Sequence, residues 1–270
     1  MQHTFGFIGT GNMGGALACA AAKAVDPDRI FLTNKTRAKA DALAEKLGAH
    51  VSTTAEISHS CTYLFLGVKP QMMADLLAEM APVLAARSDR FILVSMAAGL
   101  TMETIRAMAG GSYPVIRIMP NTPVSVGEGV ILYDATPDVA EEELALFLTA
   151  LRKGGLLDRL PEHLIDAGSA VAGCGPAFAD LFLEALADGG VACGLPRAKA
   201  LAYAAQMLKG AASLQLESGA HPGQLKDAVC SPGGSTIAGV RALEQRAFRA
   251  AAMEAVEAAY QRNKALGKAK

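Results

Sequence analysis

The chain has 270 residues, a formal net charge of −1 and a pI of about 6.5. Hydrophobic residues make up 51% of the sequence and charged residues 19%, so the chain has enough apolar material for a packed core and is not a disordered protein. Tryptophan is absent and aromatic residues reach only 5%, which together with the lack of a basic excess argues against a nucleic-acid-binding protein. The length fits one large domain or two modest ones.

The cysteines and the lengths of the apolar runs bear on where in the cell the protein resides. The five cysteines are odd in number and none forms a C-x-x-C pair, and the five histidines are scattered, so we expect free thiols and no metal site. The apolar runs, such as 63–66 and 91–94, have strand length, and none approaches the roughly 20 residues of a membrane helix. The stretch 16–22 has no basic segment before it and follows a glycine loop, which argues against a signal peptide. We therefore predict a cytoplasmic protein that contacts neither a membrane nor nucleic acid.

The first part of the chain alternates strand and helix patterns. Short apolar runs predict strands at 4–8, 29–33, 63–68, 91–95, 115–118 and 130–133. Helices are predicted at 12–23, 37–47, 71–86, 101–108 and 138–153. Thr53 and Glu56 form a capping-box pattern that opens a further short helix. This alternation implies βαβ units, and hence a mainly parallel sheet covered on both faces.

A glycine-rich loop follows the first predicted strand. The segment Gly9-Thr10-Gly11-Asn12-Met13-Gly14 fits G-x-G-x-x-G between a strand and a helix, which is the context that a dinucleotide-binding loop requires. Its glycines permit a tight turn and let backbone N–H groups approach a pyrophosphate, and the helix N-terminus adds favourable partial charge. We expect a Rossmann-type cofactor site here; the alternative is an ordinary tight turn.

The end of the second predicted strand bears on the choice of cofactor. NAD sites commonly place Asp or Glu there to bind the ribose 2′-hydroxyl, but this chain has Asn34, Lys35 and Arg37. An amide and two cations can receive a 2′-phosphate, and no carboxylate repels it. The pattern favours NADPH, with NADH as an alternative donor; otherwise the two cations simply face solvent at a helix start.

Three later strand ends carry small or conformationally fixed residues. They are Val68-Lys69-Pro70, Met96-Ala97-Ala98 and the segment 119–123, which contains Asn121. Ligands of open parallel sheets lie outside the carboxyl ends of the strands, so together these segments predict one cofactor cleft, although each alone is an ordinary loop. We expect Lys69 to position the cofactor and not to act as a catalytic lysine.

The pattern changes after Pro161. Helices are predicted at 162–171, 177–192, 197–217 and 224–229, the stretch 236–266 is largely helical, and no strand is predicted. The fold class is thus an α/β Rossmann domain with a mainly parallel sheet over 1–160, followed by an all-α domain over 161–270 for dimerisation and substrate binding. Alanine-rich helices bury little apolar area alone, so we expect a homodimer.

A turn of small residues precedes the last helical stretch. Ser231-Pro232-Gly233-Gly234-Ser235-Thr236 frees several N–H groups at a helix start, which suits a carboxylate, and adds three hydroxyls. A simple helix-cap turn between two helices explains the same residues equally well.

Taken together, these segments resemble the pyrroline-5-carboxylate reductase family along nearly the whole chain. The resemblance includes the N-terminal glycine loop and the strand ends above. Its distinctive part is C-terminal, where Gly173–Phe178, Asp188–Val191, Gly194–Arg197, His221–Leu225 and Ser231–Ile237 follow in family order. It implies a Rossmann domain, a helical dimerisation domain whose dimers often form decamers, and NAD(P)H-dependent reduction of 1-pyrroline-5-carboxylate to L-proline, the final step of proline biosynthesis.

The resemblance also implies a set of site residues. Thr236 and Ser231 are assigned to catalysis, Thr236 as the partner of the ring nitrogen, and the substrate carboxylate is assigned to Val229, Gly233, Gly234 and Ser235. The cofactor is assigned to Ile8, Gly9, Thr10, Gly11, Asn12, Met13, Asn34, Lys35, Arg37, Val68, Lys69, Pro70, Met96, Ala97, Ala98 and Asn121.

Two other functions fit parts of the sequence. A β-hydroxyacid dehydrogenase shares the G-x-G-x-M-G start and a helical second domain, but its K-x-x-N motif is missing from this sequence. A non-catalytic NADP-binding protein is the other alternative.

Overall fold

The computed structural model describes residues 3–266. The chain divides into two compact units, Met1–Cys174 with Ala259–Lys270, and Gly175–Ala258. The helix α7 (Glu162–Ala172) therefore belongs to the first unit, because it packs on the sheet there. Our assignment of cofactor binding to 1–160 and of substrate binding and dimerisation to 161–270 concerns function and stays a prediction.

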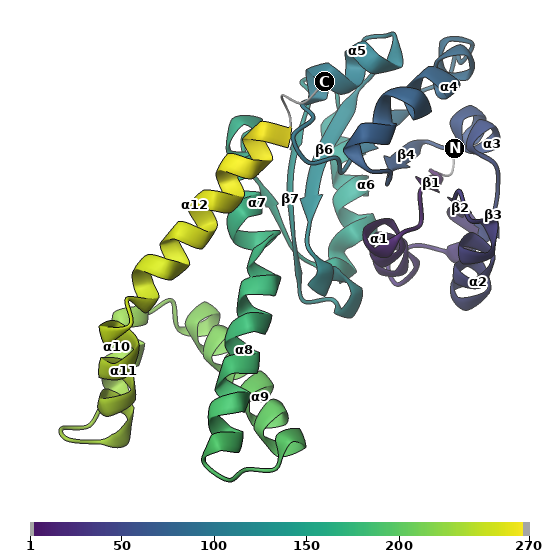
Figure 1. The fold of residues 1–270 in the computed structure, drawn as a ribbon. Coiled ribbons are helices and arrows are strands. Elements are labelled where there is room, and N and C mark those ends of the chain that lie inside the picture. The colour runs from purple at the N-terminus through teal and green to yellow at the C-terminus, as the bar shows by residue number, and fades with distance from the viewer. Residues whose placement is uncertain (1–2, 267–270) are drawn as a thin grey trace. The chain divides into compact units, whose positions relative to one another are not determined.

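One sheet organises the first unit. Its order is β3-β2-β1-β4-β5-β6-β7-β8, and all neighbouring strands run parallel except the antiparallel pair β6–β7 (Figure 1). The strands are β1 (Phe5–Ile8), β2 (Ile30–Thr33), β3 (His50–Val51), β4 (Tyr63–Leu66), β5 (Ile92–Ser95), β6 (Val115–Pro120), β7 (Gly129–Ala135) and β8 (Gly155–Arg159). The strand order turns between β1 and β4, and open α/β sheets bind ligands at such a point.

Helices cover both faces of this sheet, as predicted. One face packs against α1 (Asn12–Ala22), α2 (Arg37–Leu47) and α6 (Glu141–Leu151), and the other against α3 (Thr54–Ser60), α4 (Met73–Ala85) and α5 (Met102–Ala109). The central strands β1 and β4 are buried along their whole length. Phe7 and Phe65 stack between them with ring centroids 4.3 Å apart.

Two strands escaped the sequence patterns. The strand β3 has only two residues, and β8 is half exposed and contains Asp158 and Arg159, so neither shows a hydrophobic run. Short elements at the edges of a sheet are held by pairing with a neighbour, which a local pattern does not report.

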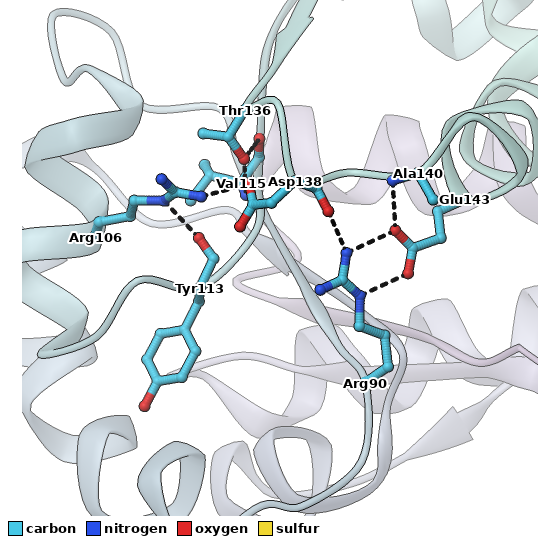
Figure 2. A network of polar contacts seen from close by, with 8 residues as sticks. All are labelled: Arg90, Arg106, Tyr113, Val115, Thr136, Asp138, Ala140 and Glu143. Atoms are coloured by element: carbon cyan, nitrogen blue, oxygen red, sulfur yellow. Dashed lines mark hydrogen bonds and ion pairs between the residues drawn. The ribbon is translucent and has the colours of Figure 1, made fainter.

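Arginine contacts fasten the connections at the edge of the sheet where β5 begins. Nε of Arg90 lies 2.7 Å from Oε1 of Glu143, and Arg106 pairs with Asp138 and donates to the carbonyl of Tyr113 (Figure 2). The hydrogen bonds from Arg90 are the main reason that the pKa of Glu143 lies below its ordinary value. This network fixes the start of α6 and the loop before β6 at the edge of the sheet opposite the carboxyl ends of the parallel strands.

The second unit contains helices only in its described part. It comprises α8 (Gly175–Ala192), α9 (Arg197–Ser218), α10 (Pro222–Ala228), α11 (Ser235–Gln245) and the first part of α12 (Phe248–Leu266). The stretch predicted as largely helical over 236–266 is broken into α11 and α12 at Ala247, whose φ of 55° lies in the left-handed region.

Large apolar side chains remain exposed on the helices. Leu181 is 69% exposed, Leu216 83% and Met253 68%. The stretch Glu162–Ala192 is also long and apolar enough for a membrane span by length and composition, with 11% of its most apolar window buried. A stretch of this length is not expected from the sequence, because Gly173 and Cys174 separate its two helices.

Candidate functional site

The glycine loop after β1 contains glycines with two different reasons to lack a side chain. Gly9 has φ +95°, and a Cβ there would lie 2.7 Å from the carbonyl oxygen of Gly67. A Cβ at Gly14 would lie 2.2 Å from the oxygen of Gly9. Gly11 has nothing within 4 Å of an added Cβ. The fold therefore requires Gly9 and Gly14, whereas Gly11 leaves open space for a ligand.

The same loop begins α1 with an uncapped N-terminus. Gly11 is the N-cap residue, and no side chain in the described range caps this helix or places a carboxylate in its first turn. The first N–H groups of a helix are unsatisfied and carry partial positive charge, so this end suits an anion. The hydroxyl of Thr10, a residue only 6% exposed, is one of two buried side-chain polar atoms in residues 3–266 without a partner.

A cavity of about 700 Å³ opens beside this loop. It brings together seven of the predicted cofactor residues: Ile8, Gly9, Gly11, Asn34, Lys35, Val68 and Lys69. Arg37 lines a neighbouring cavity of about 330 Å³. Thr10, Asn12, Met13 and Pro70 do not line either cavity, although Thr10 and Asn12 adjoin Gly11 and Pro70 adjoins Lys69, which do.

The loop after β2 has the polar character expected for a 2′-phosphate. Nδ2 of Asn34 donates to the carbonyl of Thr36 at 3.1 Å, which fixes the turn before α2. Lys35 is exposed, and Nε of Arg37 lies 3.6 Å from Oδ1 of Asp41 in an exposed pair. Both cations can therefore reorient toward an anion at low energetic cost.

Helix α4 adds two carboxylates that sequence reasoning missed. Asp75 and Glu79 line the large cavity with Leu76 between them, and Glu79 also lines the smaller one. Only the strand order, which puts β4 beside β1, brings α4 to this place. The acidic residues of an ordinary amphipathic helix give no sequence signal for such a position.

The residues after β5 pack against the apolar core, and Ala97 is buried in it. Ala97 is 1% exposed, and Met96 and Ala98 pack against two other apolar clusters. Oγ of Ser95 accepts a hydrogen bond from the backbone N–H of Ala97 at 3.4 Å. The side chain of Ala97 is therefore closed to a cofactor, whereas those of Met96 and Ala98 are only partly buried.

The side chain of Asn121 is occupied by hydrogen bonds within the fold. Its Oδ1 accepts from the N–H of Val130 at 2.8 Å, and its Nδ2 donates to the carbonyl of Ala172 at 3.0 Å. The side chain links β6, β7 and α7, so the predicted cofactor contact of Asn121 rests on its backbone alone.

The second unit holds the predicted substrate residues in the turn between α10 and α11. Gly233 has φ +69°, and a Cβ at Gly234 would lie 2.4 Å from Oγ of Ser231. Gly234 is the N-cap of α11, with no capping side chain among the described residues, so the N–H groups at Ser235 and Thr236 begin an uncapped helix. The free N–H groups at this helix start suit a carboxylate, in the same way that those at the start of α1 suit a phosphate.

A cavity of about 670 Å³ touches this turn. Gly233 and Gly234 line it with Lys226 and Arg241, whereas Val229, Ser231, Ser235 and Thr236 do not. No group of three His, Cys, Asp or Glu side chains within the described range could hold a metal ion. The chemistry available at this turn is thus that of backbone N–H groups, hydroxyls and nearby cations.

Comparisons with known proteins match both parts of the chain. Residues 4–99 match the family model described as NADP oxidoreductase, coenzyme F420-dependent, and residues 162–266 match the model for pyrroline-5-carboxylate reductase dimerisation. Among curated proteins, the pyrroline-5-carboxylate reductase of Escherichia coli is 38% identical over 99% of this chain and 100% of its own length. The enzyme of the same name from Synechocystis is 40% identical with the same coverage.

Solved structures agree with these matches. A pyrroline-5-carboxylate reductase from Coxiella burnetii has a TM-score of 0.88 at 31% identity, with 100% of both chains covered. The pyrroline carboxylate reductase of Plasmodium falciparum, solved with NADP bound, has a TM-score of 0.86 at 31% identity and covers 99% of both chains.

Proposed function

Because the chain belongs to the pyrroline-5-carboxylate reductase family, we propose that its two uncapped helix starts, at α1 and α11, divide the binding of cofactor and substrate between them. The chain is an oxidoreductase that reduces 1-pyrroline-5-carboxylate to L-proline with NADPH. The observation that carries this conclusion is a match of 38–40% identity over 99% of the chain, which spans both helix starts.

The N-terminal site fits a dinucleotide. The open space at Gly11, the free N-terminus of α1 and the unpartnered Thr10 hydroxyl suit a pyrophosphate. Lys35 and Arg37 suit a phosphate on the adenosine ribose. When bound, the reduced nicotinamide supplies a hydride to the carbon of the substrate C=N bond.

The turn before α11 serves the substrate in this proposal. Backbone N–H groups around Gly233, Gly234 and Ser235 hold the carboxylate, with Ser231 and Val229 beside them. The hydroxyl of Thr236 accepts the hydrogen bond of the protonated ring nitrogen and keeps it as the imine becomes an amine. A protonated imine is already electrophilic, so the site needs no strong general acid, and it contains none among its proposed residues.

The chain forms a homo-oligomer through its dimerisation region. We propose that the assembly unit is a dimer, that dimers associate further into decamers, and that the exposed side chains of Leu181, Leu216 and Met253 are covered by a second copy of the chain and not by a membrane. Light scattering at micromolar concentration tests this assembly, and an active monomer would contradict it. We also propose a cytoplasmic location, which the five free cysteines support.

The direct test of function is oxidation of NADPH with and without 1-pyrroline-5-carboxylate. Turnover that depends on this imine, with proline as the product, is expected. Turnover with a β-hydroxyacid instead would support the dehydrogenase alternative. NADPH binding without turnover of either substrate would indicate a non-catalytic binding protein.

A further inference from the structure

Helix α4 presents a carboxylate to both parts of the adenosine end of the cofactor site. The larger and smaller cavities share Thr33, Asn34, Thr54 and Glu79, so they adjoin around the end of β2. Asp75 lies one helical turn before Glu79 and lines only the larger cavity. Glu79 is thus the acidic residue common to the two cavities.

The two cations proposed to bind the 2′-phosphate line the same two spaces. Lys35 lines the larger cavity and Arg37 the smaller one. Glu79 is exposed, and it forms no hydrogen bond or ion pair in the described part of the chain. Its negative charge is therefore not cancelled by a partner and acts on whatever occupies the groove.

We infer that Glu79 is a specificity-determining residue that opposes the 2′-phosphate of NADPH across the groove from Lys35 and Arg37. This inference rests on the proposed placement of the adenosine phosphate at the end of β2. NADH has a hydroxyl in place of that phosphate, so the repulsion acts on NADPH alone. Glu79 thereby reduces the preference for NADPH over NADH that Lys35 and Arg37 create. NADH thus remains usable as a second hydride donor.

A carboxylate in this position could instead accept a hydrogen bond from the adenine amino group. Adenine is common to both cofactors, so loss of such a bond would weaken both. The two roles therefore predict different results for the uncharged isostere Glu79→Gln.

The test measures binding without turnover. Calorimetry would compare adenosine 2′,5′-bisphosphate with adenosine 5′-monophosphate, using the wild-type protein, Glu79→Gln and the charge-matched control Glu142→Gln. Glu142 is an exposed residue of α6, which packs on the opposite face of the sheet. Glu79→Gln should bind the bisphosphate about three- to tenfold more tightly, and the monophosphate within about twofold of wild type.

The gain should shrink at high salt, because screening removes the repulsion in the wild type. The ratio of kcat/KM with NADPH to that with NADH should rise by a similar factor. Unchanged bisphosphate affinity, or equal weakening of both ligands, would overturn the inference. Absence of imine-dependent NADPH oxidation by the wild type would instead contradict the proposed function, since the titrations need no reaction.

Discussion

Nη2 of Arg117 lies 2.7 Å from Oδ1 of Asp166 and so ties the buried middle of β6 to α7. Only 2% of the Arg117 side chain is exposed, and Oε1 of Glu162 lies 3.5 Å from its Nη1. That same oxygen accepts a hydrogen bond from the N–H of Met102 at the start of α5. These contacts hold the first helix after the sheet in one place.

Asp166→Ala should destabilise the protein strongly, because it removes the closer of the two carboxylates that pair with the buried guanidinium of Arg117. Breaking a buried pair in this way costs about 3–5 kcal/mol in the free energy of unfolding. Denaturant unfolding at fixed protein concentration measures it. Glu244→Gln, which removes the exposed pair with Arg249, is the control and should change this free energy by at most about 1 kcal/mol. Similar small effects for both variants would refute the structural role of Asp166.

The lowered pKa of Glu143 makes stability depend on pH. A carboxyl whose pKa is depressed on folding stabilises the native state above its unfolded value near 4.5, and this contribution is lost as the pH falls through the folded pKa. Glu143→Gln should reduce the free energy of unfolding at neutral pH by about 1 kcal/mol. Below pH 4.5 the difference from wild type should shrink, and urea unfolding at several pH values would show it. A difference that is constant with pH would contradict the assignment.

Gly11→Ala should separate cofactor binding from folding. The added methyl group meets nothing within 4 Å in the protein, and Gly11 has φ −70°, which alanine adopts easily. The melting temperature should stay near that of wild type, while NADPH binding weakens by at least about tenfold because the methyl group occupies the pyrophosphate position. Gly14→Ala is the contrast, since its Cβ would lie 2.2 Å from a carbonyl oxygen and folding itself should suffer. Full NADPH affinity in Gly11→Ala would place the pyrophosphate elsewhere.

Lys35→Ala should narrow the preference for NADPH. Removing an exposed cation from the groove should reduce kcat/KM with NADPH by about three- to tenfold and leave that with NADH within about twofold. Lys39→Ala removes an equally exposed charge that lines neither cavity, and it should leave both values unchanged. Steady-state kinetics of both variants with NADPH and with NADH would measure these values. A wild-type enzyme that uses NADH as well as or better than NADPH would disprove the electrostatic argument.

Thr236→Ala should lower kcat, whereas Ser231→Ala should raise the KM of the imine. Loss of one neutral hydrogen bond, worth about 0.5–1.5 kcal/mol, corresponds to roughly three- to tenfold in rate. NADPH affinity should remain that of wild type, because the proposed nucleotide-binding residues belong to the first unit. If Thr236→Ala keeps wild-type kcat and KM, its hydroxyl has no role beyond the start of α11.

The sequence predicted the sheet well where burial is continuous. The strands β1, β4 and β5 are buried along their length, so each appears in the sequence as a mainly apolar run. The edge strands β3 and β8 depend on pairing with strands distant in sequence, which no local pattern reports, and no glycine or proline marks the break at Ala247. Alanine is a strong helix former, so continuation of the helix through 247 was the natural prediction.

The parts of the candidate site that could be predicted from the sequence are those that lie in a recognisable sequence motif. Gly9 and Gly11 of the glycine loop line one cavity with Lys35, and Arg37 lines the adjoining one, whereas their role in cofactor binding stays a prediction. The engagement of Asn121 with Val130 and Ala172 was not foreseeable, because an amide at a strand end suits a cofactor as well as a structural link. Glu79 was missed because its position depends on the strand order and not on its neighbours in sequence.

The first unit includes residues from both ends of the chain, since Ala259–Lys270 belongs with Met1–Cys174. Nδ2 of Asn263, a residue only 9% exposed, donates to the carbonyl of Asp166 at 3.3 Å. During synthesis the sheet leaves the ribosome first, but this contact forms only after the helical unit has been made. The first unit therefore cannot be completed until Gly175–Ala258, which separates its two segments in the sequence, has been synthesised.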